Sequence, residues 1–311
     1  MKITVFGLGA MGSIYAALLA DDGNEVWAVD PWKEQIEAIQ RNGLKVDGAS
    51  GDRTVSSINV AENTEDLLED LKDTELFIVA TKAGGVESAA KTIQPLINSS
   101  NHVLTIQNGL GSGERIAEFI PERNILLGVA EGFGASVKEP GYIQHTAMKM
   151  IRIGSYKKGN ENIVEDITKM WQRAGFNANS YSDITQLIWE KFICNVAYSA
   201  PCTVFEKSVI ELIKDPSGQK VSQNCALEAW RVACEKGINL CFEDPIDYIT
   251  EFAERVGDSR PSMYLDHLAH RPSEIDAING MVPVVANSVG LEAQYNEVLT
   301  HILRSREAAW K

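Results

Sequence analysis

The sequence predicts an α/β protein with an N-terminal doubly wound parallel sheet and an all-helical C-terminal domain. Short apolar runs alternate with helical stretches from residue 3 to residue 129, which is typical of parallel sheets covered by helices. A glycine-rich turn joins the first apolar run to the first helical stretch. From Asp183 onward the pattern is almost entirely helical. We therefore predict two domains, residues 1–180 and residues 181–311.

The first thirty residues carry the most specific pattern. The apolar run Ile3–Phe6 is short enough for a buried strand and ends in the turn Gly7-Leu8-Gly9-Ala10-Met11-Gly12. A helical stretch follows from Ala10 to about Ala20. A second apolar run, Val26–Val29, ends at Asp30. Strand, glycine turn, helix, strand and acid in this order are the Rossmann-type dinucleotide-binding fingerprint.

The glycines of this turn have distinct tasks. Gly7 allows the tight turn out of the strand, Gly9 lets a pyrophosphate approach the backbone, and Gly12 lets the helix pack closely on the sheet. The free N–H groups and the positive end of the helix then face the phosphates. We predict that the turn from Gly7 to Gly12 binds a dinucleotide cofactor. A purely structural glycine turn is the alternative, which the full context disfavours.

Asp30 bears on the choice of cofactor. An acid at the end of the second strand suits the two hydroxyls of an adenosine ribose and would repel a 2′-phosphate. No Arg follows it, because the next residues are Pro31, Trp32 and Lys33. The sequence therefore favours NADH. Lys33 keeps NADPH open, since a lysine can pair with a phosphate.

Further elements are expected to complete the sheet domain. Strands are predicted within 44–60, and over Glu75–Ala80, His102–Ile106, Ile125–Val129 and extended pieces around Pro140-Gly141 up to Ser155. Helices are predicted over Lys33–Arg41, Asp66–Lys72, Gly85–Ile97, a stretch ending at Ile120, and Asn162–Ala174. Right-handed crossovers place the carboxyl ends of such strands at one edge. The glycine turn, Lys82 and Asn108 are therefore expected on that edge, where ligands bind.

The second half is predicted to hold six helices. They are expected over Ile184–Tyr198, Val221–Lys236, Pro245–Val256, Ser262–His270, Glu274–Ser288 and Gln294–Ala309. Pro272 should end one helix, and Ser273 should cap the next with Asp276 as a capping-box-like partner. On this reading Glu274 lies in the first helical turn, where it would at least satisfy the helix dipole.

Composition excludes several classes of protein. The net charge of −14 argues against nucleic acid and against an anionic membrane surface as partners. No apolar stretch reaches the length of a membrane span, and the N-terminus lacks a signal-peptide pattern. The five cysteines form no Cys-x-x-Cys pair, so reduced, mostly packed thiols are expected. We predict a cytoplasmic protein.

Lys191 and Asn195 are candidates for chemistry in the helical half. They are four residues apart and share one face of a partly buried helix. On this stretch alone, a surface lysine and a packing asparagine are the simpler interpretation. His267 and His270 lack further ligands nearby in the sequence, so solvated or hydrogen-bonded histidines are expected rather than a metal site.

Several separated motifs in this order resemble the ketopantoate reductase (2-dehydropantoate 2-reductase) family, including its D-2-hydroxyacid dehydrogenase relatives. The resemblance covers nearly the whole chain. Its motifs are the glycine turn, Thr81-Lys82-Ala83, Gln107-Asn108-Gly109, Pro140-Gly141 to His145, Trp189-Glu190-Lys191 with Asn195, Ser262, Glu274-Ile275-Asp276 and Ile278-Asn279-Gly280.

The resemblance implies reduction of a small 2-oxo acid with NAD(P)H in a cleft between two domains. It implies that Lys191 is the general acid and that Glu274 orients Lys191 and the substrate. It implies that Asn195 and Ser262 hold the substrate, and that Lys82 and Asn108 line the junction between nicotinamide and substrate. An ammonium group stabilises the negative charge that grows on a ketone oxygen and then protonates it.

Two departures point away from ketopantoate and NADPH. Ketopantoate reductases of this family usually carry a substrate-binding Asn before a Pro after the lysine helix, whereas this chain has Ser199-Ala200-Pro201. Asp30-Pro31 stands where an NADP-binding Arg is expected. Both changes resemble the NAD-using D-2-hydroxyacid dehydrogenase branch.

Two alternatives and one structural question remain open from the sequence. A reductase of an imine or a polyol phosphate could use the same scaffold, and a redox sensor could keep only the dinucleotide site. Apolar faces on the C-terminal helices could form core or the interface of a homodimer.

Overall fold

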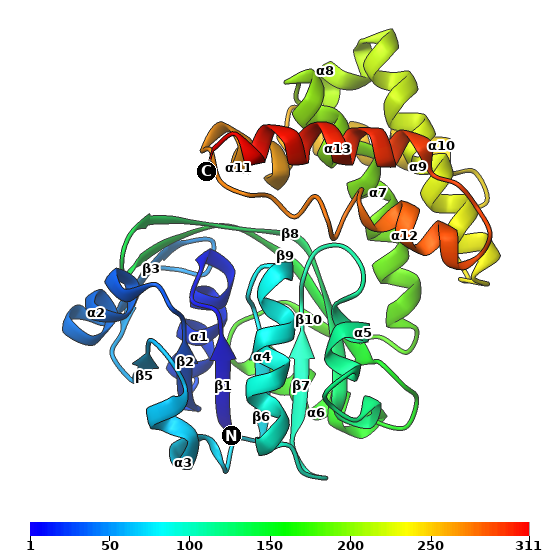
Figure 1. The fold of residues 1–311 in the computed structure, drawn as a ribbon. Helices are drawn as coiled ribbons and strands as arrows, with labels where there is room; N and C mark the ends of the chain where they lie inside the picture. Colours follow the sequence, from blue (N-terminus) through cyan, green and yellow to red (C-terminus); the bar gives the residue numbers. More distant parts are fainter. Residues whose placement is uncertain (311) are drawn as a thin grey trace. The chain divides into compact units, whose positions relative to one another are not determined.

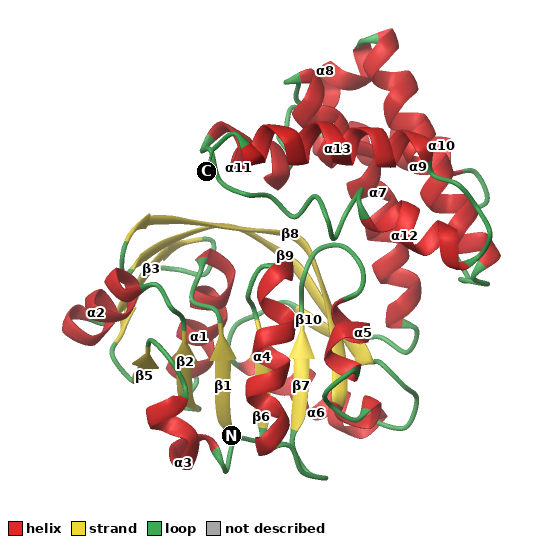
Figure 2. Cartoon of the chain, viewed as in Figure 1, coloured by secondary structure: helices red, strands yellow, loops and turns green. Residues whose placement is uncertain are grey.

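The protein divides into two compact units. The computed structural model describes residues 1–310. A sheet unit comprises residues 1–107 and 112–184, and a helical unit comprises residues 108–111 and 185 onward. Figure 1 follows the chain through both, and Figure 2 shows that the strands all belong to the sheet unit. The sequence did not predict that residues 108–111 belong to the helical unit, because a loop of four residues has no periodic pattern.

The sheet unit is built on one ten-stranded sheet. Its order is β4-β3-β9-β8-β7-β6-β1-β2-β5, and β10 pairs with β9. The strands are β1 (Lys2–Phe6), β2 (Glu25–Val29), β3 (Leu44–Gly48), β4 (Arg53–Val55), β5 (Ile58–Ala61), β6 (Leu76–Val79), β7 (His102–Thr105), β8 (Ile125–Glu139), β9 (Tyr142–Ser155) and β10 (Ala178–Ser180). The helices are α1 (Ala10–Asp21), α2 (Lys33–Asn42), α3 (Leu68–Leu71), α4 (Val86–Ile93), α5 (Ser112–Ala117) and α6 (Glu161–Arg173).

The central strands form the predicted parallel sheet. Every pair along β7-β6-β1-β2-β5 is parallel, and Phe6 pairs with both Val29 and Val79. The carboxyl ends of β1, β2 and β6 therefore lie side by side. Most buried residues of these strands are apolar, as expected for a sheet covered by helices, and Thr4, His102 and Thr105 are buried polar exceptions.

A long hairpin extends this parallel core. Strands β8 and β9 pair antiparallel across a turn at Pro140-Gly141, where Gly141 has φ +79°. The sequence predicted extended pieces around this turn, and the structure shows continuous strands with two register shifts. Helix α1 contacts both β8 and β9 as well as β1 and β2. Its residues from Gly12 to Ala20 are consequently all buried.

The helical unit is formed by the helices of the second half of the chain. Its helices are α7 (Ile184–Phe205), α8 (Val209–Lys214), α9 (Pro216–Glu235), α10 (Pro245–Val256), α11 (Ser262–Leu268), α12 (Met281–Ser288) and α13 (Gln294–Ala308). Helix α7 continues past the predicted end at Tyr198 and includes Pro201. Helix α8 was not predicted, although Ser208 and Glu211 form a capping box at its start. Its six residues are too short to show a clear period.

The predicted helix over Glu274–Ser288 is wrong in its first half. Residues 274–280 form a bend and successive turns, and the helix begins at Met281. Asp276 does not act in a capping box, because its carboxylate pairs with Arg304 at 2.6 Å. The Ser273 hydroxyl accepts instead from the N–H of Ile275 at 3.3 Å. Asp276 is thus bound by Arg304, a residue distant in sequence, and does not form the local capping box with Ser273 that the sequence spacing predicted.

Candidate active site

The glycine turn after β1 has the geometry that its sequence predicted. Gly7 has φ +101°, which favours glycine. A Cβ on Gly12 would lie 1.9 Å from the Gly7 carbonyl oxygen, so only glycine fits there. A Cβ on Gly9 would meet no atom within 4 Å, and Gly9 is exposed. Open space therefore lies beside Gly9 at the start of α1. Unlike Gly7 and Gly12, Gly9 is not required by steric constraints within the protein.

Two buried side chains hold this turn. The Leu8 carbonyl accepts from the Ser13 hydroxyl at 2.9 Å and from Gln35 Nε2 at 3.1 Å. Gln35 also accepts from the N–H of Gly141 at 2.8 Å, which ties the turn to the β8–β9 hairpin. Sequence reasoning missed Gln35, because a glutamine in a polar helix gives no signal of burial.

Asp30 lies at the carboxyl end of β2, beside the glycine turn. One carboxylate oxygen accepts from the N–H of Leu8 at 2.6 Å, and the other accepts from the N–H of Trp32 at 2.8 Å. Each oxygen keeps a further lone pair for another donor. Asp30 therefore has a structural role that the sequence did not reveal, and it retains the capacity to accept from hydroxyl groups.

Two further predicted positions follow β6 and β7. Lys82 is exposed at the start of a short 3-10 turn (Ala83–Gly85). Gln107 donates to the carbonyls of Val79 and Thr81 at 2.7 and 3.2 Å, which fixes the backbone between β6 and Lys82. The next residue, Asn108, already belongs to the helical unit.

Asn108, Lys191 and Glu274 are joined by hydrogen bonds in the helical unit. Lys191 Nζ donates to Asn108 Oδ1 at 2.9 Å, and Asn108 Nδ2 donates to Glu274 Oε2 at 3.3 Å. All three side chains are half-buried. We call these residues the Lys–Asn–Glu chain. It unites an ammonium, an amide and a carboxylate from positions 83 residues or more apart in sequence.

The loop carrying Asn108 is fixed by its neighbours. The N–H of Leu110 donates to the Ala277 carbonyl at 3.0 Å. Gly109 has φ +84°, and a Cβ there would lie 2.0 Å from the same carbonyl oxygen. Any side chain at position 109 would therefore push the loop away from the turns that follow Glu274.

Asn195, Ser199 and Ser262 are the other residues considered for substrate binding. Asn195 and Ser199 lie one and two turns after Lys191 on α7, so the three share a helix face. Asn195 is half-buried, and Ser199 is only 4% exposed. Ser262 is exposed at the start of α11, and no hydrogen bond joins it to the Lys–Asn–Glu chain within the described residues.

Asn279 holds the backbone of α7 near the candidate site, a role that the sequence did not indicate. It is fully buried, and its Nδ2 donates to the Val196 carbonyl of α7 at 2.9 Å. Its Oδ1 accepts from the N–H of Ala200 at 3.3 Å. The same Nδ2 also donates to Asn296 Oδ1 at 2.8 Å. Asn279 therefore links the turn segment after Glu274 to the part of α7 that carries Asn195 and Ser199.

Comparisons with known proteins identify the family. Residues 3–158 match the family described as ketopantoate reductase PanE/ApbA, and residues 183–307 match its C-terminal family. The chain belongs to the ketopantoate reductase family. Curated relatives include a 2-dehydropantoate 2-reductase of Streptococcus pyogenes, 28% identical over 309 residues, covering 99% of this chain and 98% of the relative. One from Pyrococcus abyssi is 30% identical over 311 residues, with the same coverage.

Solved structures of relatives have the same fold. A ternary structure of D-mandelate dehydrogenase with NADH and anilino(oxo)acetate has a TM-score of 0.89 at 27% identity, covering 100% of this chain and 99% of that one. A 2-dehydropantoate 2-reductase from Geobacter metallireducens has a TM-score of 0.88 at 27% identity, covering 98% and 99%. As a ketopantoate reductase family member, the protein is an NAD(P)-dependent oxidoreductase acting on CH–OH groups.

Cys202 and Cys241 are not activated thiols, and Glu190 has a structural partner. Burial raises the pKa of the Cys202 thiol to about 12, and partial desolvation together with the neighbouring Glu190 carboxylate raises that of the Cys241 thiol to about 11, so both stay protonated near neutral pH. Glu190, next to Lys191, is buried and accepts from the N–H of Cys241 at 2.8 Å. Over residues 1–65 and 67–310 no group of three His, Cys, Asp or Glu side chains is arranged to hold a metal ion. Nor does any helix in that range have the length and apolarity needed to cross a bilayer.

Proposed function

We propose that the protein reduces a small 2-oxo acid to the 2-hydroxy acid with NADH, and that Lys191 is the general acid. The observation that carries this proposal is the Lys–Asn–Glu chain, which places a half-buried ammonium beside an amide and a carboxylate. The matching family, and its relatives named 2-dehydropantoate 2-reductase and D-mandelate dehydrogenase, support the same reaction class.

In this proposal the sheet unit holds the cofactor. The turn from Gly7 to Gly12 offers backbone N–H groups and the N-terminus of α1 to a pyrophosphate, and the open space beside Gly9 fits it. Asp30 accepts from the ribose hydroxyls through its remaining lone pairs. Lys82, after β6, contacts the nicotinamide end. When bound, the reduced nicotinamide supplies a hydride.

In this proposal, residues of the helical unit stabilise and protonate the carbonyl oxygen of the substrate. Hydride addition at C2 breaks the C=O π bond and leaves an electron pair on oxygen. Lys191 Nζ stabilises that oxygen and transfers a proton to it, so the product is an alcohol and a neutral amine that is reprotonated from water. Glu274 and Asn108 orient the lysine. Asn195, Ser199 and Ser262 would bind the carboxylate or side chain of the substrate.

Two residues support the proposed preferences for NADH and for a substrate other than ketopantoate. Asp30 disfavours a 2′-phosphate, and Ser199 replaces the substrate-binding Asn of ketopantoate reductases. The D-mandelate dehydrogenase structures contain NADH. Cytoplasmic localisation and a homodimer stay predictions. Exposed apolar side chains on α12 and α13, such as Val284 and Val298, are compatible with a second copy.

The deciding experiment is a rate comparison. Oxidation of NADH and NADPH is followed over a panel of 2-oxo acids that includes ketopantoate, branched and aromatic members. We expect the highest kcat/KM with NADH and a branched or aromatic 2-oxo acid. Ketopantoate turned over best with NADPH would contradict our readings of Asp30 and Ser199. Tight NADH binding without turnover would indicate a sensor or another carbonyl or imine substrate.

Replacement of Lys191 tests the general acid. We expect Lys191→Ala to lower kcat by about 10²- to 10⁴-fold, because proton donation and charge stabilisation are both lost. The matched control is Lys236→Ala, at an exposed position after α9, which should leave kcat unchanged. Circular dichroism checks that both variants fold. A Lys191→Ala enzyme with near wild-type kcat would refute the assignment.

A further inference from the structure

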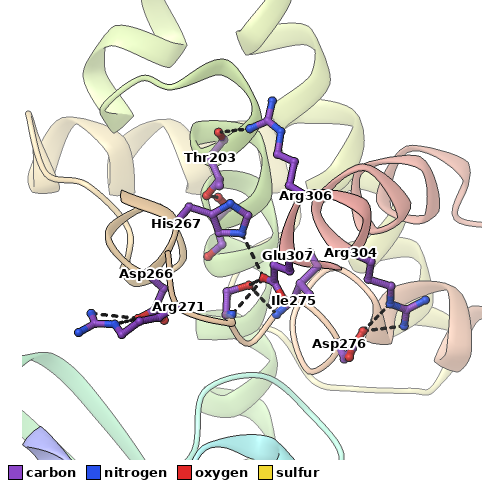
Figure 3. Close-up of polar contacts among 11 residues, drawn as sticks. Thr203, Asp266, His267, Arg271, Ile275, Asp276, Arg304, Arg306 and Glu307 are labelled. Carbon is purple, nitrogen blue, oxygen red and sulfur yellow. Dashed lines mark hydrogen bonds and ion pairs between the residues drawn. The ribbon is translucent and has the colours of Figure 1, made fainter. Parts of the chain in front are cut away.

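The segment that carries Glu274 is not part of a helix, so its conformation depends on contacts from elsewhere. Residues 271–273 have no regular secondary structure, and residues 274–280 form a bend and successive turns. The end of helix α13 lies beside this segment and supplies several side chains to it (Figure 3). The contacts concentrate on the residue immediately before Glu274 and on Asp276.

Glu307, in the last turn of α13, holds the residue before Glu274. One of its carboxylate oxygens accepts from the Ser273 N–H at 3.0 Å and from the Ser273 hydroxyl at 2.6 Å. The same oxygen lies 3.1 Å from His267 Nε2. The side chains of His267 and Glu307 are only 7% and 14% exposed. Hydrogen bonds to a carboxylate that is shielded from water are strong and directional.

A second contact from α13 provides a comparison. Arg304, one turn earlier, pairs with Asp276 at 2.6 Å. Their side chains are 50% and 71% exposed, so solvent weakens this pair. Glu307 and Arg304 thus reach the same segment from the same helix, one from a shielded position and one from the surface (Figure 3).

The neighbouring Arg306 ties α13 to the helix that bears Lys191. Its guanidinium donates to the carbonyls of Thr203 and Val204, at 3.3 and 3.5 Å, near the end of α7. The last turns of α13 therefore contact both the Glu274 segment and α7. A shift of this helix end would be transmitted to two members of the Lys–Asn–Glu chain.

We propose that Glu307 is a positioning residue for Glu274, fixing the backbone at Ser273 so that the Glu274 carboxylate meets Asn108 and, through it, Lys191. The inference rests on the proposed function. Glu307 touches neither substrate nor cofactor in this scheme, and its effect on the reaction passes through Ser273. It should therefore govern the geometry of the proton donor more than substrate binding.

The test compares three variants at a temperature where circular dichroism shows all to be folded. We expect Glu307→Ala to lower kcat by about tenfold or more, since small misplacement of a catalytic group is costly, and to change each KM less than about threefold. Glu307→Gln keeps an acceptor oxygen for Ser273 and should restore most of kcat. Arg304→Ala, the matched surface control, should stay within about twofold of the wild-type kcat.

Several results would overturn the inference. One is a folded Glu307→Ala enzyme with wild-type kcat, or with a raised KM and unchanged kcat. Another is an equal loss of kcat in Glu307→Ala and Arg304→Ala, which would mean that the segment needs only general support. If Glu307→Ala does not fold, Glu307→Asp replaces it, because the shorter side chain withdraws the carboxylate from both Ser273 donors. Unchanged kcat in that variant would also refute the role.

Two outcomes distinguish a failure of the proposed function from a failure of the positioning role of Glu307. If Lys191→Ala retains wild-type kcat, the general-acid assignment is wrong and the positioning role falls with it. If Lys191→Ala is inactive while folded Glu307→Ala is fully active, the function stands and only the positioning role is refuted.

Discussion

Asp30 combines a structural and a proposed binding role in one carboxylate. Both oxygens already accept from backbone N–H groups, one of them in the glycine turn. Removing the whole side chain would therefore disturb the turn and weaken binding of any dinucleotide. A test of cofactor choice has to remove the charge and keep an acceptor.

Asp30→Asn meets this requirement. The amide oxygen can still accept from the N–H of Leu8, while repulsion of a 2′-phosphate is lost. We expect the ratio of kcat/KM for NADH over NADPH to fall by about tenfold, equivalent to ~1.4 kcal/mol of differential binding. Asp22→Asn, at an exposed position after α1, should leave the ratio unchanged. An unaltered ratio in Asp30→Asn would exclude the ribose role.

At the scale of single elements, α7 depends on a residue outside it. Pro201 lies within the helix and has no N–H to donate to the Ala197 carbonyl. Just before it, the amide of Asn279 bonds to the Val196 carbonyl and the Ala200 N–H, two groups that an α-helix pairs with each other. A neighbouring segment thus supplies hydrogen-bond partners to one carbonyl and one N–H of α7 in the turn before Pro201.

Asn279→Ala should be strongly destabilising. It would leave buried partners on α7 and at Asn296 without a hydrogen bond, so we expect the free energy of unfolding to fall by about 2–4 kcal/mol. Asn287→Ala, at an exposed position of α12, should change it by less than about 0.5 kcal/mol. Urea unfolding measures both. A loss below 1 kcal/mol for Asn279→Ala would argue against the bridging role.

For the whole molecule, buried histidines predict a loss of stability in mild acid. Burial is the main cause that lowers the pKa of His102, His145 and His267 below the ordinary 6.5. The unfolded chain therefore binds more protons than the folded protein once the pH falls below about 6.5, and stability falls with pH there.

Urea unfolding at pH 7.5 and pH 5.5 tests this expectation. We expect a lower free energy of unfolding at pH 5.5. His145→Phe, which cannot bind a proton and keeps a ring beside Phe133, should show a smaller decrease than the unchanged protein. Equal stability of the unchanged protein at both pH values would contradict the prediction.

Much of the fold was predictable because it depends on local patterns. The strands at Ile3, Val26 and Glu75 and the helices at Ala10, Lys33 and Gln294 begin within one residue of their predicted positions. The error at Glu274 has the opposite origin. Ser273 and Asp276 have the spacing of a helix cap, but Glu307 and Arg304 bind these side chains from 28 or more residues away. Sequence spacing cannot reveal such partners.

The sequence by itself determined the fold class, the glycine turn and the residue types of the candidate site, because apolar periodicity, steric demands and side-chain chemistry are local properties. Only the tertiary structure decided which of those residues meet. It joined Lys191 to Asn108 and Glu274, left Ser262 exposed, and gave Asp30, Asn279 and Glu307 partners in distant segments. These choices depend on packing between elements, where a hydrogen bond or a close backbone approach links residues that no sequence period connects.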